Sequence, residues 1–221
     1  MPIAATALEP IADAPRSVRE RLIAAGEQLF AERGWNAVSI RTIAAAADVS
    51  LAALNYHFGL KENLLAEIFA ARARPIAEER ERRLTELEAS GRMTLETVLD
   101  AFLRPAMSPG SDGRFGGPVF ARLRARLATE PEEFTRRILG DAFDASSRRY
   151  IAALKALLPE LAEAELAWRF HFLLGTMVYT MADAGRIQAL TSGACDPGDA
   201  EAALARLVPF LAAGFRSAPP A

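Results

Sequence analysis

Residues 39–61, SIRTIAAAADVSLAALNYHFGLK, decide the fold that we predict for this chain. Ser39 and Ser50 each stand directly before an apolar segment, as serines that cap helix N-termini do. The pattern therefore predicts two short helices, 40–47 and 51–58, separated by a three-residue turn. Two short helices joined in this way are the plan of a helix-turn-helix motif.

The segments on either side of this motif also have the spacing of helices. Apolar residues recur every three or four positions from Val18 to Arg33, and Gly34 ends that segment as a C-cap glycine does. A long helix begins near Lys61, and Pro75 is expected to kink or interrupt it. Further helices are expected at 94–107, 118–128, 132–157, 162–190 and 197–214. Because the alternation typical of strands is absent, we predict an all-α protein of about nine helices.

These segments divide the chain into two domains between two tails. The expected parts are a disordered tail at 1–15, a three-helix helix-turn-helix domain at 16–62, a helical ligand-binding and dimerisation domain at 63–215, and a tail at 216–221. Residues 108–117, SPGSDGRFGG, are expected to form a loop, because glycine, serine and proline dominate them.

The composition is that of a folded, water-soluble protein. Hydrophobic residues make up 51% of the 221 residues, which excludes wholesale disorder. The formal net charge of -2 argues against a protein that coats nucleic acid without specificity, so any DNA contact must come from a local patch. The single cysteine, Cys195, permits no intrachain disulfide, and the N-terminus lacks the regions of a signal peptide. We therefore expect a cytoplasmic protein with no membrane partner.

The second short helix has one face suited to anchoring and another suited to a DNA groove. Leu54 and Phe58 repeat at i,i+4 and are expected to pack on the scaffold. Ala52 and Ala53 are small enough to let the helix approach the major groove, where Asn55 is expected to read a base edge.

Three further side chains near the end of this helix have the chemistry to hold phosphates. The Tyr56 hydroxyl and the His57 ring can donate hydrogen bonds. Lys61 combines its own charge with the positive end of the next helix dipole. The alternative is that Tyr56 and His57 only pack the small domain.

The run from Ile40 to Phe69, IRTIAAAADVSLAALNYHFGLKENLLAEIF, resembles the DNA-binding domain of TetR-type (tetracycline-repressor-like) regulators. In that family the pattern T-I-A-x-x-A-x-V-S leads into a recognition helix that ends in Tyr-His-Phe and is followed by Lys. This chain has these letters at Thr42-Ile43-Ala44, Ala47, Val49-Ser50, Tyr56-His57-Phe58 and Lys61. It departs from the pattern at Leu60, where the family commonly has a serine that caps the next helix.

The resemblance implies which residues meet DNA and how the protein assembles. It assigns operator phosphates to Thr42, Tyr56, His57 and Lys61, and the floor of the groove to Leu51, Ala52, Ala53 and Asn55. It also implies a homodimer on a palindromic operator, joined by a four-helix bundle of the last two helices of each subunit. The segments LAALNYHFG and RLRARLATEP resemble a branch of the family that responds to fatty-acid-related molecules.

The last two expected helices carry apolar faces that suit such a dimer interface. Leu204, Leu207, Val208 and Leu211 form a stripe at i, i+3, i+4 and i+7. The preceding helix, which includes Met177, is apolar nearly all round and so needs cover on every side. We expect these residues to meet a partner subunit.

The middle helices are expected to line a cavity for a small-molecule effector. The candidates are Phe102, Met107, Phe120, Arg122, Arg126, Phe134, Tyr150, His171 and Tyr179. The apolar candidates have plain core packing as their alternative role, and His171 that of a core histidine. We expect a mostly apolar effector with an acidic head on Arg122 or Arg126. The long helix beginning at Lys61 is the expected lever to the recognition helix, and its charged run from Glu78 to Glu88 is expected to be a solvated face.

These features predict a sequence-specific transcriptional repressor that is a homodimer on double-stranded operator DNA and is released by a small molecule. The alternative is a helical adaptor or ligand-binding protein that binds no operator. An enzyme is not expected, because the two histidines, His57 and His171, fall in different predicted domains. No motif for a cofactor or a metal occurs, and we expect neither.

Overall fold

The computed structural model describes residues 17–107, 117–130, 133–182 and 185–218, and this part of the chain contains helices and no strands. The helices are α1 (Val18–Arg33), α2 (Ile40–Ala46), α3 (Leu51–Phe58), α4 (Lys61–Ser90), α5 (Leu95–Met107), α6 (Gly117–Thr129), α7 (Glu133–Leu157), α8 (Glu163–Met181), α9 (Arg186–Leu190) and α10 (Ala200–Arg216). The prediction of an all-α fold is confirmed. The expected tail at 1–15, nearly all of the loop at 108–117 and the end of the tail at 216–221 lie outside the described residues. None of the described helices is long and apolar enough to span a bilayer.

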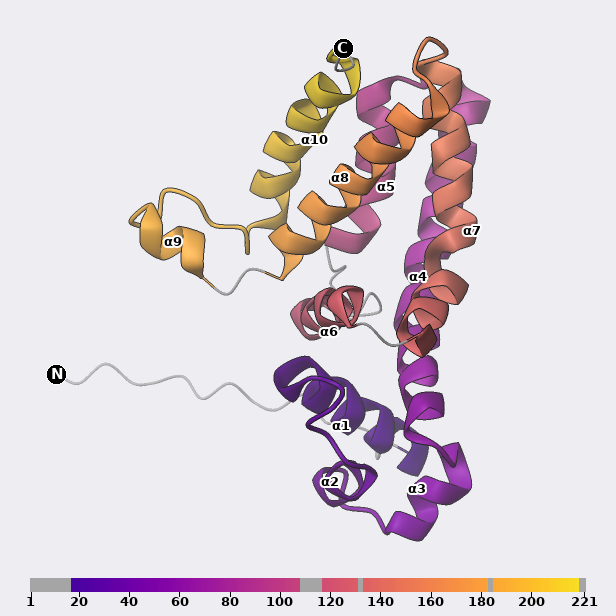
Figure 1. Ribbon diagram of the computed structural model, residues 1–221, viewed down its shortest axis with the longest axis vertical. Coiled ribbons are helices and arrows are strands. Elements are labelled where there is room, and N and C mark those ends of the chain that lie inside the picture. The colour runs from indigo at the N-terminus through magenta and orange to yellow at the C-terminus, as the bar shows by residue number, and fades with distance from the viewer. Residues whose placement is uncertain (1–16, 108–116, 131–132, 183–184, 219–221) are drawn as a thin grey trace, which may run out of the picture.

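Helices α1, α2 and α3 form the lower body in Figure 1, together with the first turns of α4. Serine hydroxyls begin all three helices, because Ser17, Ser39 and Ser50 accept hydrogen bonds from backbone amides three residues ahead. The apolar faces of these helices meet in one core that includes Leu22 and Ile43. The helix boundaries that the sequence predicts here are confirmed within one residue.

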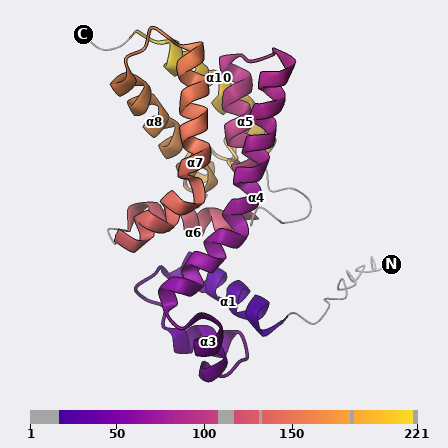
Figure 2. The same cartoon turned by 90° about the vertical axis from the view of Figure 1, so that its right-hand side faces the viewer.

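Helix α4 runs from the lower body to the top of the molecule without a break (Figures 1 and 2). Pro75 lies inside the helix and does not interrupt it, so of the two expected effects, a kink or a break, the break does not occur. Residues on both sides of the proline are buried, among them Phe69, Ala73 and Ile76, and packing against α1, α5 and α7 holds the helix together. The expected domain boundary at residue 62 falls in the first turn of α4, so both parts of the molecule share this helix.

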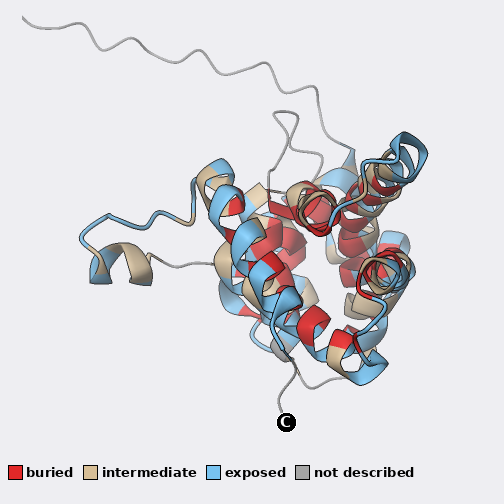
Figure 3. Cartoon of the chain, turned by 90° about the horizontal axis from the view of Figure 1, so that it is seen from above, coloured by how far each residue is buried: buried red, intermediate tan, exposed pale blue. Residues whose placement is uncertain are grey.

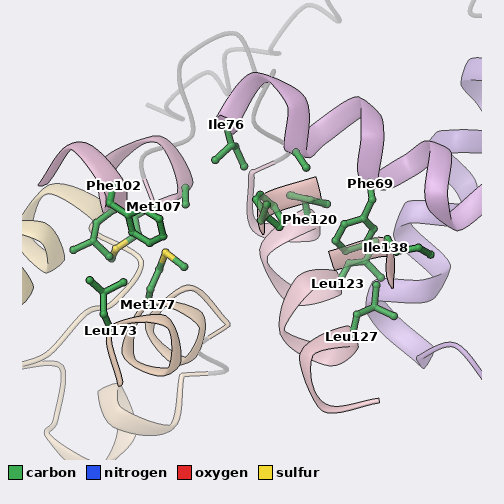
Figure 4. Packing of buried hydrophobic residues seen from close by; sticks show 14 of the residues in the cluster. Phe69, Ile76, Phe102, Met107, Phe120, Leu123, Leu127, Ile138, Leu173 and Met177 are labelled. Atoms are coloured by element: carbon green, nitrogen blue, oxygen red, sulfur yellow. The ribbon is translucent and has the colours of Figure 1, made fainter. Parts of the chain in front are cut away.

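The upper body consists of α5, α7, α8, α10 and the later part of α4. Helix α6 lies between this body and the lower one and packs on α1 (Figure 1). Seen from above, the buried residues face the interior of this bundle (Figure 3). Figure 4 shows two groups of buried side chains, with Phe102, Met107, Leu173 and Met177 in one and Phe69, Phe120, Leu123, Leu127 and Ile138 in the other. The helix expected at 162–190 is divided, because α8 ends at Met181 and the short α9 projects from the body (Figures 1 and 3).

The charged run of α4 is only partly a solvated face. Glu79 pairs with Arg82 at 2.6 Å and with Arg83 at 2.7 Å, and these pairs lie at the surface as expected. Arg82 also pairs with the carboxylate of Glu86. Arg80 contradicts the expectation, because its side chain is 0% exposed and points into the bundle.

Candidate DNA-binding site

Helix α3 has the two faces that the sequence predicts. Leu54 and Phe58 are buried and hold the helix on the lower body. Asn55 and His57 are exposed, and Tyr56 is 87% exposed. Ala52 is exposed as well, so the outward face combines a small side chain with amide, hydroxyl and imidazole groups. This is the chemistry that base edges and phosphates require.

Three of the other expected contact residues are half-buried at the edge of this face. Leu51 and Ala53 lie in the first turn of α3, and Ala53 donates its backbone N–H to the Ser50 hydroxyl at 3.1 Å. The Thr42 hydroxyl is 2.9 Å from the Ser39 hydroxyl, within the cap of α2. The exposed Arg41 precedes Thr42 in the first turn of α2 and is not among the residues that the sequence indicated.

Lys61 has a scaffolding role that the sequence does not reveal. Its Nζ donates hydrogen bonds to the carbonyl oxygens of Trp35 and Val38, both at 2.9 Å, and lies 3.9 Å from the centroid of the Trp35 ring. Partial burial lowers the pKa of Lys61, while the carboxylate of Glu62 opposes that shift. Leu60 supplies no side-chain cap to α4. Lys61 thus ties α4 to the loop after α1 through two of its three N–H groups.

Two residues expected in the ligand cavity instead join the upper body to the lower one. The ring of Phe134, on α7, lies 4.6 Å from the Trp35 ring. Arg126, on α6, donates to the carbonyl oxygen of Ala31 at 2.8 Å and to that of Glu32 at 3.0 Å. Phe134 and Arg126 thus lie at the junction between the two bodies.

The remaining cavity candidates separate into an inner and an outer set. Phe102, Phe120 and Tyr150 are buried, and the Phe102 and Tyr150 rings are 5.1 Å apart. Met107 and Arg122 line a cavity of about 240 Å³ where α5, α6 and α8 meet.

The outer set does not reach that interior. His171 and Tyr179 lie on the exposed side of α8, and His171 contacts the rings of Trp168 and Phe172. His171 is exposed, so the alternative role of a core histidine is wrong.

The residues expected at a dimer interface are turned inward. Met177, Leu204, Leu207 and Leu211 are buried, and Val208 is half-buried against the same core. The stripe on α10 is covered by α5 and α8 of the same chain. The aromatic side chains left uncovered on these two helices are Trp168, Phe172 and Tyr179 on α8 and Phe210 on α10.

Comparison with known proteins identifies the family. A family model described as "Tetracyclin repressor-like, C-terminal domain" matches residues 100–214, and one described as "Bacterial regulatory proteins, tetR family" matches residues 22–68. The HTH-type transcriptional dual regulator CecR of Shigella flexneri is 37% identical over 90 residues, which are 38% of this chain and 40% of that protein's length.

Solved structures of regulators share the fold. The TetR family regulator PfmR from Thermus thermophilus superposes with a TM-score of 0.61 at 19% identity, covering 93% of this chain and 100% of the other. The hemolysin II transcriptional regulator HlyIIR gives a TM-score of 0.60 at 18% identity, covering 88% and 97%. With the helix-turn-helix in place and the C-terminal family model matching more than half of its length, this chain belongs to the TetR family of bacterial transcriptional regulators.

Proposed function

We propose that this regulator is a homodimeric repressor in the cytoplasm, which binds a palindromic operator and leaves it when a small, mostly apolar molecule binds. Regulators of this family are DNA-binding transcription factors and not enzymes. The observation that carries the proposal is the face of α3, where Leu54 and Phe58 anchor the helix and Asn55 and Tyr56 are presented to solvent.

The two kinds of DNA contact fall to different residues. Leu51, Ala52, Ala53 and Asn55 approach the floor of the major groove, and the Asn55 amide forms a pair of hydrogen bonds with an adenine. Thr42, Tyr56, His57 and the third N–H of Lys61 contact phosphates. We add Arg41, an exposed arginine that precedes Thr42 in α2.

The dimer forms through the uncovered aromatic face of α8 and α10. Tyr179 and Phe210 line one hollow of about 700 Å³ between α8, α9 and α10, so the two helices present a common face. Trp168 and Phe172 extend that face along α8. Exposed aromatic side chains in such number are typical of protein interfaces. A two-fold axis there places the two α3 helices on half-sites one helical turn of DNA apart.

Release of the operator requires a connection between the upper body and α3. Helix α4 is continuous between them, and α6 is bound to the end of α1 through Arg126. A ligand that favours another placement of these helices changes the spacing of the recognition helices. Reciprocity then requires operator DNA to weaken ligand binding by the same factor.

A fluorescence anisotropy titration tests the proposal with the full chain and the DNA upstream of its own gene. We expect binding with a dependence on salt and competition by an unlabelled palindrome from that fragment, but not by scrambled DNA. Equal competition by both DNAs would contradict sequence-specific repression. It would favour instead a helical adaptor or ligand-binding protein without an operator.

A further inference from the structure

Two of the buried charged side chains, Glu27 and Arg169, are paired with an oppositely charged side chain. Glu27 receives hydrogen bonds from Arg72, the shortest 2.8 Å long. Arg169 pairs with Glu165 at 2.8 Å and donates to the carbonyl oxygen of Phe215 at 2.6 Å. Both follow the general rule that a charge removed from water needs a counter-charge or hydrogen bonds.

Arg80 and Arg124 depart from this rule. Arg80 Nε donates to the Phe102 carbonyl at 2.8 Å and Nη2 lies 3.7 Å from the Met177 sulfur, but Nη1 is buried with no hydrogen-bond partner. Arg124 Nη1 is also buried without a partner, and its guanidinium lies 4.4 Å from the centroid of the Phe143 ring. No carboxylate among the described residues pairs with either guanidinium.

The two guanidiniums belong to one site. Arg80 is 5.9 Å from the Phe143 centroid, so the same ring contacts both cations. Burial lowers the pKa of Arg124 to about 10, and burial together with the charge of Arg124 lowers the pKa of Arg80. Two neighbouring cations in an apolar interior repel each other, and an anion between them would relieve both the repulsion and the loss of hydration.

A cavity lined by both apolar and polar residues, with Arg122 and Asp196 among the polar ones, lies close to the pair. The cavity of about 240 Å³ is lined by Ala121, one helical turn before Arg124 on α6, and by Met181, one turn after Met177 on α8. It is smaller than the pockets of roughly 300 to 1,000 Å³ that enclose drug-sized molecules, which points to a small ligand. Met107 completes an apolar wall on α5.

We infer that Arg80 and Arg124 bind the acidic head of the effector, and that the effector is a small organic carboxylate whose apolar body lies toward the cavity between α5, α6 and α8. This inference rests on the proposed function, because it names the ligand class of the regulatory domain. Guanidinium groups bind carboxylates through paired, charge-assisted hydrogen bonds, and the two unpartnered Nη1 atoms are the donors. The pair takes the place of Arg122 and Arg126, since Arg122 is exposed and Arg126 binds α1.

The position of Arg124 also explains how the site reaches DNA. Arg124 and Arg126 are two residues apart on α6, and Arg126 holds the last turn of α1. A carboxylate that draws Arg124 toward Arg80 shifts or rotates α6. Since α1 packs on α2 and α3, the same shift displaces the helix-turn-helix.

The first test measures stability, because an unpaired buried cation destabilises the protein that carries it. Arg124→Met replaces the guanidinium with an apolar side chain of similar length, and Arg148→Met, on the exposed surface of α7, is the matched control. In buffer free of organic acids we expect Arg124→Met to melt at least about 2 °C above the wild type, and Arg148→Met to melt within that margin of it. A lower melting temperature for Arg124→Met would overturn the inference, because Arg124 would then stabilise the fold without a ligand.

The second test measures ligand binding with octanoate, its neutral analogue octan-1-ol, and acetate as a carboxylate without a tail. We expect octanoate to raise the melting temperature of the wild type, octan-1-ol and acetate to raise it less, and Arg124→Met to lose the octanoate response. Equal shifts with octanoate and octan-1-ol, no shift at all with octanoate, or a response that Arg122→Met loses and Arg124→Met keeps would each overturn the carboxylate site.

Operator binding by the wild type without octanoate is measured in parallel and reports on the proposed function alone. A protein that does not bind the operator but responds normally to octanoate would contradict the repressor function and support the carboxylate site. A protein that binds the operator but does not respond to octanoate would support the repressor function and contradict the carboxylate site.

Discussion

Arg126 on α6 donates a 2.8 Å hydrogen bond from Nε to the carbonyl oxygen of Ala31 in the last turn of α1. Carbonyl groups in the last turn of a helix have no partner within the helix, and a cation there also meets the negative end of the helix dipole. The contact therefore stabilises α1 at the point where the upper and lower bodies meet.

Replacing Arg126 with methionine should weaken that junction. We expect Arg126→Met to lower the free energy of unfolding by about 2 kcal/mol, because two hydrogen bonds from a charged donor are lost. Urea denaturation followed by circular dichroism measures the change. Arg122→Met, an exposed arginine one turn earlier on the same helix, is the control and should differ from the wild type by less than about 0.5 kcal/mol. Equal stabilities of the two variants would show that the junction does not form in solution.

Lys61 should contribute to both stability and DNA binding. Lys61→Met removes two hydrogen bonds and the contact with Trp35, so we expect a loss of about 2 kcal/mol in the free energy of unfolding. If its third N–H holds a phosphate, the slope of log affinity against log salt falls by about one unit.

Lys155 offers the matched control for this lysine. Its Nζ also donates to two carbonyl oxygens, those of Pro159 and Leu161, but it lies at the far end of α7. We expect Lys155→Met to be destabilised while its salt slope is that of the wild type. A Lys61→Met protein with an unchanged slope would assign Lys61 to the scaffold alone.

Asn55 and Tyr56 should differ in how their loss depends on the DNA sequence. Both side chains are exposed, so neither Asn55→Ala nor Tyr56→Phe is expected to change the melting temperature. Asn55→Ala should relax the preference at particular base pairs by about 1 to 3 kcal/mol. Tyr56→Phe should weaken binding to the operator and to unrelated DNA by similar factors. A library of operator variants measures both, and a uniform loss with Asn55→Ala would remove Asn55 from base recognition.

Local features of this fold were predictable from the sequence, and long-range ones were not. Ser39 and Ser50 cap their helices by accepting hydrogen bonds from backbone amides only three residues away. The local sequence therefore suffices to predict where α2 and α3 begin. Arg80 stands among charged residues that do lie at the surface. Only the packing of α5 and α7 on α4, together with Met177 of α8, buries it. The spacing identifies the apolar stripe to which Leu207 belongs, but it does not reveal that α5 of the same chain packs on this stripe.

The ion pairs of Glu79 should make stability depend on pH. Hydrogen bonds from Arg82, then those from Arg83, lower the pKa of Glu79 to about 2, against the opposing effect of burial. A carboxyl group whose pKa is lowered in the folded state stabilises the protein above its unfolded pKa, and the contribution is lost as the pH falls through the folded pKa. Because Arg82 is half-exposed, we expect Glu79→Gln to cost only about 1 kcal/mol at pH 7, and clearly less at pH 2, where about half of the folded carboxyl groups are protonated. Denaturation at both pH values measures this, with the exposed Glu78→Gln as control, and an equally large loss at pH 2 would refute the electrostatic cause.

The uncovered aromatic face separates dimerisation from folding. Phe210 is 70% exposed in the single chain, so Phe210→Glu should fold normally, yet it places a charge in the interface between copies. We expect sedimentation to show a monomer whose melting temperature no longer depends on protein concentration, and the operator affinity to fall because one α3 helix is lost. Leu207→Glu, one turn earlier on α10, is the matched variant for the buried face and should lose about 3 kcal/mol of stability. A Phe210→Glu protein that sediments as a dimer would place the interface away from α10, and a stable, monomeric Leu207→Glu protein would return it to the stripe that the sequence first indicated.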